Sequence, residues 1–538
     1  MCEYTFENGN KCQEKPIKGS KFCILHCEFP DDHEGLVFKN ILKAKEMKLK
    51  EKFEIEDFNF EGAILKNLNL SDKKISTDTN FYKSIIYTDI NFNDVTFYGN
   101  LNFLRASIRG NAFISNINVK GDCFFADSII GEDLNLKNVM IEKNAYFSNA
   151  KVHNRVNLKV VNIDEAASFS ELEVGEHFFI DQLRVGKSLL IHEAKIEGEL
   201  SFSDTNIDGL FSLDETNIGR NLAFRDVNIG KKANFCKVHV KRFLRFRDFE
   251  IEGDADFNGA RIESFFAFFG GNFGGEVDFT GAKIGGQTYF GGITFEKSVI
   301  FGGTVIEGDL IFNENPIKNS GNDVTPKKCM FCDYLFLPNT KILGGFHVEN
   351  TEYKKSKAQE EVFRKFRLIF EEVGDRSNAD KYFVKEMQIK WKQKLEEAFL
   401  NRNNLQIFIL LFEKIFGDIF LKYGTAWKRV LGVWFGVIFL SSIIFWMLGG
   451  VEYITTTNIG FFDSVSNSTV YIPISGYETA TSLWDNVYFS ILTITTLGYG
   501  DLHPKPEPLF QFLAGMVAIY GAFTWAAFIA IIARIYMR

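Results

Sequence analysis

LSFSDTNIDGLFSLDETNIGRNLAF, residues 200–224, carries the pattern that decides the fold of most of this chain. Its large apolar residues recur at gaps that alternate between five and six. They are Phe202, Ile207, Leu213, Ile218 and Phe224. This spacing is neither a helix period nor a coiled-coil heptad. The same alternation extends from Leu70 to Phe312, and a short period kept over such a length predicts a solenoid.

The residue two places before each large one is often small or aliphatic, as at Ala233, Ala255 and Val277. A small residue, one polar residue and then Phe or Ile resembles the pentapeptide-repeat family. The resemblance implies a right-handed, four-sided β-helix in which both residues of each pair face inward. One extra residue on two sides gives a coil of 22 residues, so eleven coils fit between Leu70 and Phe312. At about 4.8 Å per stacked strand the rod is roughly 50 Å long, and the 58 phenylalanines are expected to stack as its core.

A second informative stretch, Thr495-Thr496-Leu497-Gly498-Tyr499-Gly500-Asp501, lies between two apolar segments near the C-terminus. Two glycines around one aromatic residue allow backbone conformations that other residues avoid. The carbonyls of residues 496–499 and the Thr496 hydroxyl could then replace the water shell of a cation. One loop supplies a quarter of such a ring, so the pore requires four chains.

The chain from about Thr425 to Arg538 resembles the pore module of two-transmembrane potassium channels, with Leu497 where that family usually has valine. The resemblance implies K+ ions in the filter and five filter residues. These are Thr496, Leu497, Gly498, Tyr499 and Gly500. Thr495, Tyr488 and Asp501 are expected to support the filter, with Tyr488 bonding Asp501. Gly515 and Gly521 are candidate hinges of the inner helix.

Two segments are long and apolar enough to cross a membrane. Residues 430–448 contain no charge and cover about 28 Å as a helix, and residues 509–535 form the second. Basic residues before the first segment and after the second place both termini in the cytoplasm, and no signal peptide is expected. We expect a multi-pass protein of the plasma membrane, the inner membrane in bacteria. No arginine-rich span precedes the pore, so voltage sensing is not expected.

Four of the eight cysteines fall within the first 27 residues. In a reducing compartment such clusters hold metal more often than disulfides. Cys2, Cys12, Cys23 and His26 supply the closed ligand set of a structural Zn2+, and Cys27 is an alternative ligand for Cys23 or His26. Spare thiols at a frayed terminus are the alternative interpretation. Four protein ligands leave no open position for a catalytic metal.

The expected fold class is therefore multidomain: a cytoplasmic quadrilateral β-helix joined to an α-helical two-transmembrane pore domain. The expected domains are a zinc-binding motif (1–30), a capping helix (31–55), the β-solenoid (56–350), a helical hairpin (351–400), an interfacial amphipathic helix (404–425) and the pore (426–538). Within the pore, the expected elements are a first span (430–448), a pore helix with filter (483–501) and a second span (508–536).

The net charge of −8 gives no basic footprint, so nucleic-acid binding is not expected. No nucleotide-binding loop or catalytic pair occurs in the solenoid, so an enzyme is not expected. We expect a homotetrameric potassium channel in the lipid bilayer. Its solenoid would regulate gating or dock a cytoplasmic ligand or protein. A membrane-anchored interaction scaffold with a poorly conducting or non-selective pore is the alternative, and a potassium-transporter subunit fits less well because such chains carry several pore repeats.

Overall fold

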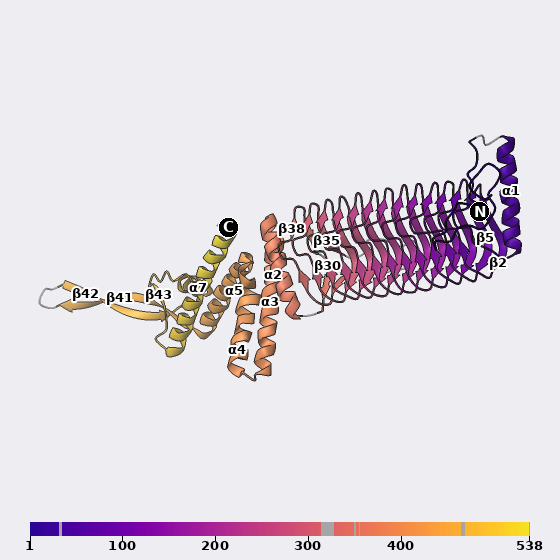
Figure 1. Ribbon diagram of the computed structural model, residues 1–538. Helices are drawn as coiled ribbons and strands as arrows, with labels where there is room; N and C mark the ends of the chain where they lie inside the picture. Colours follow the sequence, from indigo (N-terminus) through magenta and orange to yellow (C-terminus); the bar gives the residue numbers. More distant parts are fainter. Residues whose placement is uncertain (32–34, 314–327, 349–350, 355, 464–467, 537–538) are drawn as a thin grey trace. The chain divides into compact units, whose positions relative to one another are not determined.

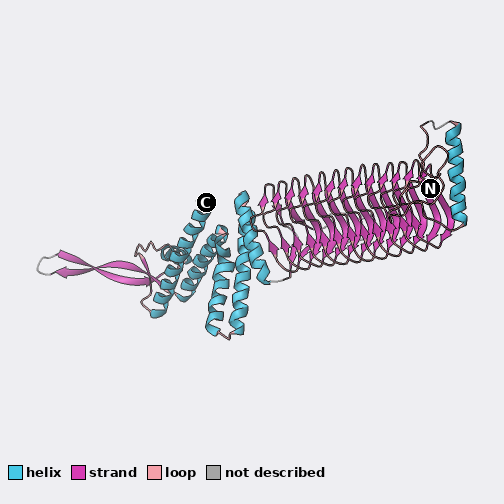
Figure 2. Ribbon diagram, viewed as in Figure 1, coloured by secondary structure: helices cyan, strands magenta, loops and turns pink. Residues whose placement is uncertain are grey.

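The computed structural model describes the chain except residues 32–34, 314–327, 349–350, 355, 464–467 and 537–538 (Figure 1). The chain divides into two compact units, Met1–Val362 and Phe363–Arg538. The first is a β-solenoid with a small N-terminal module and helix α1 (Leu36–Glu54) at its start. The second is mostly helical (Figure 2).

Three parallel sheets form the solenoid, which has about twelve turns within the described residues. One sheet contains long strands. They are β2 (Leu68–Ile75), β5 (Ile90–Phe97), β8 (Ala112–Val119), β11 (Leu134–Ile141), β14 (Val156–Ile163), β17 (Phe178–Val185), β20 (Leu200–Ile207), β23 (Leu222–Ile229), β26 (Leu244–Ile251), β29 (Phe266–Phe273) and β32 (Thr288–Phe295). The other two sheets consist mainly of two-residue strands such as β6 (Leu101–Asn102) and β7 (Ser107–Ile108). Phe202 pairs with Phe224 and Phe224 with Phe246, which confirms the 22-residue coil.

Each coil has four sides because every long strand bends in its middle. In β5 the bend is at Asp94, which has φ of 54°, and the next turn contains Arg105, with φ of 57°. Four inward pairs follow one another around this coil, all at most 1 % exposed. They are Ile90 and Phe92, Val95 and Phe97, Leu101 and Phe103, and Ala106 and Ile108. The alternation of five and six residues in the sequence is therefore the spacing between successive sides of the coil.

The left-handed position recurs every eleven residues along the solenoid. From Asp72 to Asp248 it is mostly held by polar residues such as Asn116 and Asp226. From Gly259 to Gly303 it is held by glycine, as at Gly270 and Gly281. Glycine reaches this conformation without steric cost, which accounts for the glycine-rich composition of the later coils.

Phenylalanine rings stack in columns along the solenoid axis. In one column Phe81, Phe103 and Phe125 follow at centroid distances of 4.6 and 4.8 Å. In another, Phe224 and Phe246 lie 4.2 Å apart, with ring planes 6° from parallel. These distances match the spacing of stacked strands, so rings stack wherever successive coils both have phenylalanine at the same position. The columns explain the excess of phenylalanine.

One coil near the C-terminal end is interrupted. Strands β35 (Leu310–Asn313) and β36 (Cys329–Phe331) both pair with β32 and therefore lie on the same rung. The loop predicted there lies largely outside the described residues. Coiling continues through β37 (Leu335–Phe336), β38 (Lys341–Ile342) and β39 (Phe346–His347), as the pairing of Leu310 with Phe346 shows.

The second unit begins within the helical segment α2 (Ser356–Val373) and continues with α3 (Arg376–Leu400). A single helix was expected over 404–425, but the structure divides this segment. Helix α4 (Asn404–Glu413) passes into the π-helical turn η1 (Lys414–Phe420) and then the 3-10 turn η2 (Lys422–Gly424). Lys422 and Tyr423 have φ of 46° and 50°, which ends the regular helix.

Two helices in the described part of the chain are long and apolar enough to cross a membrane. They are α5 (Trp427–Leu448) and, in α7 (Pro508–Tyr536), residues Pro508–Ala533. Between them lie β41 (Val451–Asp463), β42 (Ser468–Thr479), α6 (Leu483–Ile494) and β43 (Leu502–Pro504). In this part of the chain β41 and β42 form a long antiparallel hairpin.

Candidate functional site

Residues 495–501 follow helix α6 and lead into β43. Thr496, Gly498 and Gly500 have positive φ angles of 56°, 48° and 84°. Left-handed residues therefore alternate with Leu497 and Tyr499, whose φ angles are not positive. A backbone that alternates in this way turns successive carbonyls toward one side. The loop thus has the backbone form needed to present a row of oxygen ligands.

Thr496 follows the C-terminal end of helix α6 in a backbone conformation that is unusual for threonine. The Thr496 N–H donates to the Thr493 carbonyl at 3.2 Å, and the Leu497 N–H donates to the Leu492 carbonyl at 3.0 Å. This is a Schellman motif, in which the left-handed position is usually occupied by glycine. A β-branched residue is strained there, and such strain persists only where the surroundings enforce it. We take the strained conformation of Thr496 as a sign that the backbone of this loop has a functional role.

The start of helix α6 is fixed by capping hydrogen bonds. The Ser482 hydroxyl accepts from the Trp484 N–H at 3.2 Å. The buried Asn486 amide donates to the Ala480 and Ser482 carbonyls at 3.2 and 2.9 Å. These bonds hold the segment before α6 against its first turn. The N-terminal end of α6 is therefore held rigidly, and this rigid base positions its C-terminal end and the loop after it.

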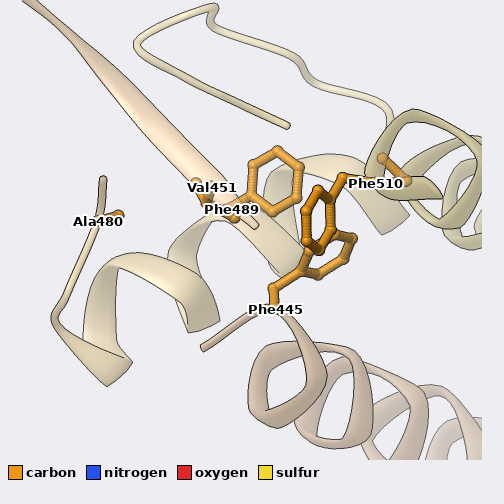
Figure 3. Close-up of a cluster of buried hydrophobic side chains, with 6 residues drawn as sticks. Phe445, Val451, Ala480, Phe489 and Phe510 are labelled. Atoms are coloured by element: carbon orange, nitrogen blue, oxygen red, sulfur yellow. The ribbon is translucent and has the colours of Figure 1, made fainter. Parts of the chain in front are cut away.

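A hydrophobic cluster joins the elements around this base (Figure 3). Phe445 of α5, Phe489 of α6 and Phe510 of α7 meet there with three smaller residues, Val451, Ala480 and Ala514. The Phe445 and Phe489 rings pack edge to face with centroids 5.2 Å apart. A Cβ on Gly450 would lie 2.4 Å from the Phe510 ring, so this position has room only for glycine. Both long helices and α6 are thereby held in one packing unit.

The other end of the loop is held by Tyr488 and by the outer hairpin. Tyr488 interacts electrostatically with the Asp501 carboxylate at this end of the loop. The hairpin contact was not predicted: β43 pairs with β41, and Glu452 lies opposite His503 in that ladder. The many β-branched and aromatic residues of the hairpin were the signal for strands. The loop is therefore anchored on both sides.

The two predicted hinge glycines have different surroundings. A Cβ on Gly521 would lie 1.9 Å from the Ile494 carbonyl oxygen, whereas a Cβ on Gly515 would meet nothing within 4 Å. Helix α7 thus makes its close approach to the C-terminal end of α6 at Gly521. This gives Gly521 a packing role that the sequence analysis did not assign.

A single chain leaves the loop uncovered. Leu497 is 59 % exposed and Tyr499 is 70 % exposed. Large apolar residues of α7, among them Phe512 and Ile519, are also exposed. Such apolar surface indicates contact with lipid or with further chains.

The segment from α4 to η2, which precedes α5, carries a network of polar contacts that the sequence did not predict. Asp418 of η1 is buried and accepts from the Gln388 amide of α3 at 3.1 Å. Lys414 pairs with the same carboxylate. The Trp391 indole N–H donates to the Leu410 carbonyl at 2.7 Å. The turns η1 and η2 also contact α5 and α7, respectively. This segment therefore links α3 to both long helices.

The four predicted metal ligands come together at the N-terminus. Their ligand atoms all lie within 4.8 Å of one another, and all four residues are buried. The Sγ atoms of Cys12 and Cys23 are 3.9 Å apart, and Nδ1 of His26 lies 3.2 Å from the Cys23 Sγ. A tetrahedral zinc with Zn–S near 2.3 Å and Zn–N near 2.0 Å requires separations of about 3.8 and 3.5 Å. The cluster therefore fits a zinc ion.

Surrounding contacts orient these ligands. The His26 Nε2 lies 2.9 Å from the Glu61 carbonyl, which favours a proton on Nε2 and leaves Nδ1 as the ligand. The Cys23 N–H donates to the Cys2 Sγ at 3.2 Å. Cys27 lies outside the cluster, with its thiol on the Ile24 carbonyl, so it is not the alternative ligand. None of the eight cysteines, all in described segments, forms a disulfide.

Comparison with protein families gives a match for part of the second unit. Residues 449–538 match the family model described as "Ion channel". The match covers the outer hairpin, α6, the loop and α7. Comparisons with curated proteins and with solved structures give no match. The chain therefore contains an ion-channel domain and a β-solenoid, and its two apolar helices indicate a membrane protein.

Proposed function

We propose that the protein is a potassium-selective channel formed by four copies of the chain. The alternation of left-handed residues at Thr496, Gly498 and Gly500 is the observation that carries this proposal. Four such loops around an axis would replace the water shell of K+ with rings of backbone carbonyls. Potassium flux through the purified protein in liposomes tests the function, and chemical cross-linking to four copies tests the assembly.

The exposed surfaces of the second unit support the assembly. Leu497 and Tyr499 are uncovered in one chain, as are apolar residues along α7. In a tetramer the loops would face one another and the outer surfaces of α5 and α7 would face lipid. Lys428 and Arg429 precede the apolar part of α5, so the start of that helix lies at the cytoplasmic side of the plasma membrane.

The soluble part of the chain regulates the gate in this proposal. The network around Asp418 joins α3 to the turns that contact α5 and α7. A π-helical turn within a helix often marks a functional hinge, and Tyr423 is held in the left-handed region. A displacement of α3 would reach the pore helices through this segment. Deletion of residues 1–350 tests the role: an unchanged open probability in an assembled channel would exclude regulation by the solenoid.

The N-terminal cluster binds one structural zinc ion in this proposal. Cys2, Cys12, Cys23 and His26 supply three thiolates and one imidazole, which fill all four positions of the metal. When bound, zinc would cross-link a module too small to form its own hydrophobic core. Metal analysis of protein purified without chelators should find about one zinc per chain. Absence of zinc from folded protein would remove this assignment.

A further inference from the structure

The first coil of the solenoid is covered by the N-terminal module, which contains Cys2, Cys12, Cys23 and His26. The Ile64 N–H of β1 (Ile64–Leu65) donates to the Leu25 carbonyl at 2.7 Å. This N–H lies at the edge of a parallel sheet, where it would otherwise lack a strand partner. The Tyr4 ring lies directly over Gly62, where a Cβ would be 2.1 Å from it, and it stacks on His26 at 4.1 Å. The metal ligands and the sheet edge are therefore in direct contact.

A buried lysine from helix α1 joins the same contact. Lys45 is 2 % exposed, and its ammonium group donates to the carbonyls of Leu25, Cys27 and Ile64 at 3.3, 2.7 and 2.7 Å. Two of these carbonyls flank the ligand His26, and the third belongs to β1. Burial lowers the pKa of Lys45 to about 8. One side chain thus ties α1, the metal-binding module and the first coil together.

Apolar contacts close the remainder of this end. Phe29, Phe38 and Ile64 form one buried cluster that joins the module, α1 and β1. Phe53 of α1 packs on Phe60 at 5.7 Å, and Phe60 begins the ring column by stacking on Phe81 at 5.1 Å. In a solenoid each coil is stabilised mainly by its neighbours, so terminal coils require a cap. Here the cap consists of α1 and the metal-binding module.

We infer that zinc at the Cys2, Cys12, Cys23 and His26 cluster locks this cap onto the first coil through the His26 contact with Glu61. The inference rests on the zinc site proposed above and adds its structural consequence. Loss of the metal would release the module, expose the Ile64 edge and free α1, while the middle coils would keep their neighbours. The lock therefore acts locally, at one end of the solenoid.

Hydrogen exchange of the full-length protein in detergent, with zinc and after chelation, tests this lock. We expect amides of residues 36–54 and 58–65 to exchange about tenfold faster or more without zinc. Amides of residues 222–246, in the middle of the solenoid, should not change. Cys23→Ser should behave like chelated protein even when zinc is supplied. Equal protection with and without zinc, in protein shown to bind the metal, would overturn the lock and leave the zinc site standing.

A second variant separates metal binding from the coupling. His26→Cys provides four thiolates that can still hold zinc, but it has no ring nitrogen to reach the Glu61 carbonyl. We expect about one zinc per chain in this variant, with fast exchange at residues 58–65. Wild-type protection in zinc-loaded His26→Cys would overturn the role of the His26 contact. Faster exchange throughout residues 56–312 on chelation would also contradict a lock that acts at one end.

Discussion

Gly521 of helix α7 lies directly against the carbonyl of Ile494, the last residue of helix α6. A Cβ at position 521 would be 1.9 Å from that oxygen, so the two helices meet without a side chain between them. The Ile494 carbonyl belongs to the turn that precedes Thr496. The position of α7 and the start of the candidate filter are therefore mechanically linked.

Gly521→Ala should weaken this contact and reduce conduction. The added methyl group collides with backbone rather than with a flexible side chain, and overpacking of this kind costs about 1–3 kcal/mol. We expect a lower yield of assembled protein and reduced potassium flux per assembled channel. Gly432→Ala, in α5, is the control because its Cβ would meet nothing within 4 Å. If both variants conduct like the wild type, the contact has no role in the pore.

Gly498→Ala should abolish flux without preventing folding. Gly498 has φ of 48°, where alanine costs about 1 kcal/mol, and a Cβ there meets nothing within 4 Å in one chain. The defect should therefore arise only where four loops converge. Liposome flux and cross-linking of the same sample separate the two effects. Gly436→Ala, in open space on α5, is the control, and normal flux through Gly498→Ala would contradict the filter assignment.

Asp418→Asn should alter the open probability of the assembled channel. The substitution weakens the charge-assisted bond from Gln388 and removes the ion pair with Lys414, and the weaker Gln388 bond loosens the joint between α3 and η1. The pair is partly exposed, so the loss should be about 1 kcal/mol. Single-channel recording in planar bilayers measures the effect. Glu413→Gln is the control, because it removes a nearby charge that takes part in none of the described ion pairs. An equal change of open probability in both variants would show that the loss of a negative charge, and not the loss of the joint, causes the effect.

Lys45→Met should destabilise the N-terminal end of the solenoid. Methionine fills a similar volume but leaves three buried carbonyls without the ammonium donor, which should cost about 3 kcal/mol. Limited proteolysis should cut this variant near α1 before the middle of the solenoid. Lys43→Met, at an exposed position of the same helix, should behave like wild type. Equal resistance of the two variants would show that Lys45 does not hold the cap.

The solenoid could be predicted from the sequence because its inward-facing residues recur with a fixed period. Phe92, Phe97 and Phe103 occupy successive sides of one coil, and a shift of one residue would expose them. The clustering of Cys2, Cys12, Cys23 and His26 was also predicted, because cysteine and histidine have few other reasons to occur together. In both cases residue type and spacing alone define the structure.

Other features depend on contacts between distant residues and could not be predicted in this way. The packing role of Gly521 depends on where α7 crosses α6, and the Gln388 donor to Asp418 comes from a different helix. The segment 404–425, expected to be one helix, is divided at Lys414, where the helix changes to a π-helical turn that the apolar pattern of the sequence did not indicate. The sequence does not distinguish Lys45 from the other lysines of its charged helix, and only the structure reveals its three carbonyl partners.

The most direct test of the central proposal is ion selectivity of the purified wild-type protein. Liposomes containing the purified protein should take up potassium rapidly and sodium poorly, because backbone carbonyl rings favour the larger dehydrated ion. Gly498→Ala liposomes with the same amount of assembled protein should take up neither. Equal uptake of both ions by the wild type, or no uptake at all, would contradict a potassium channel and favour a membrane-anchored scaffold.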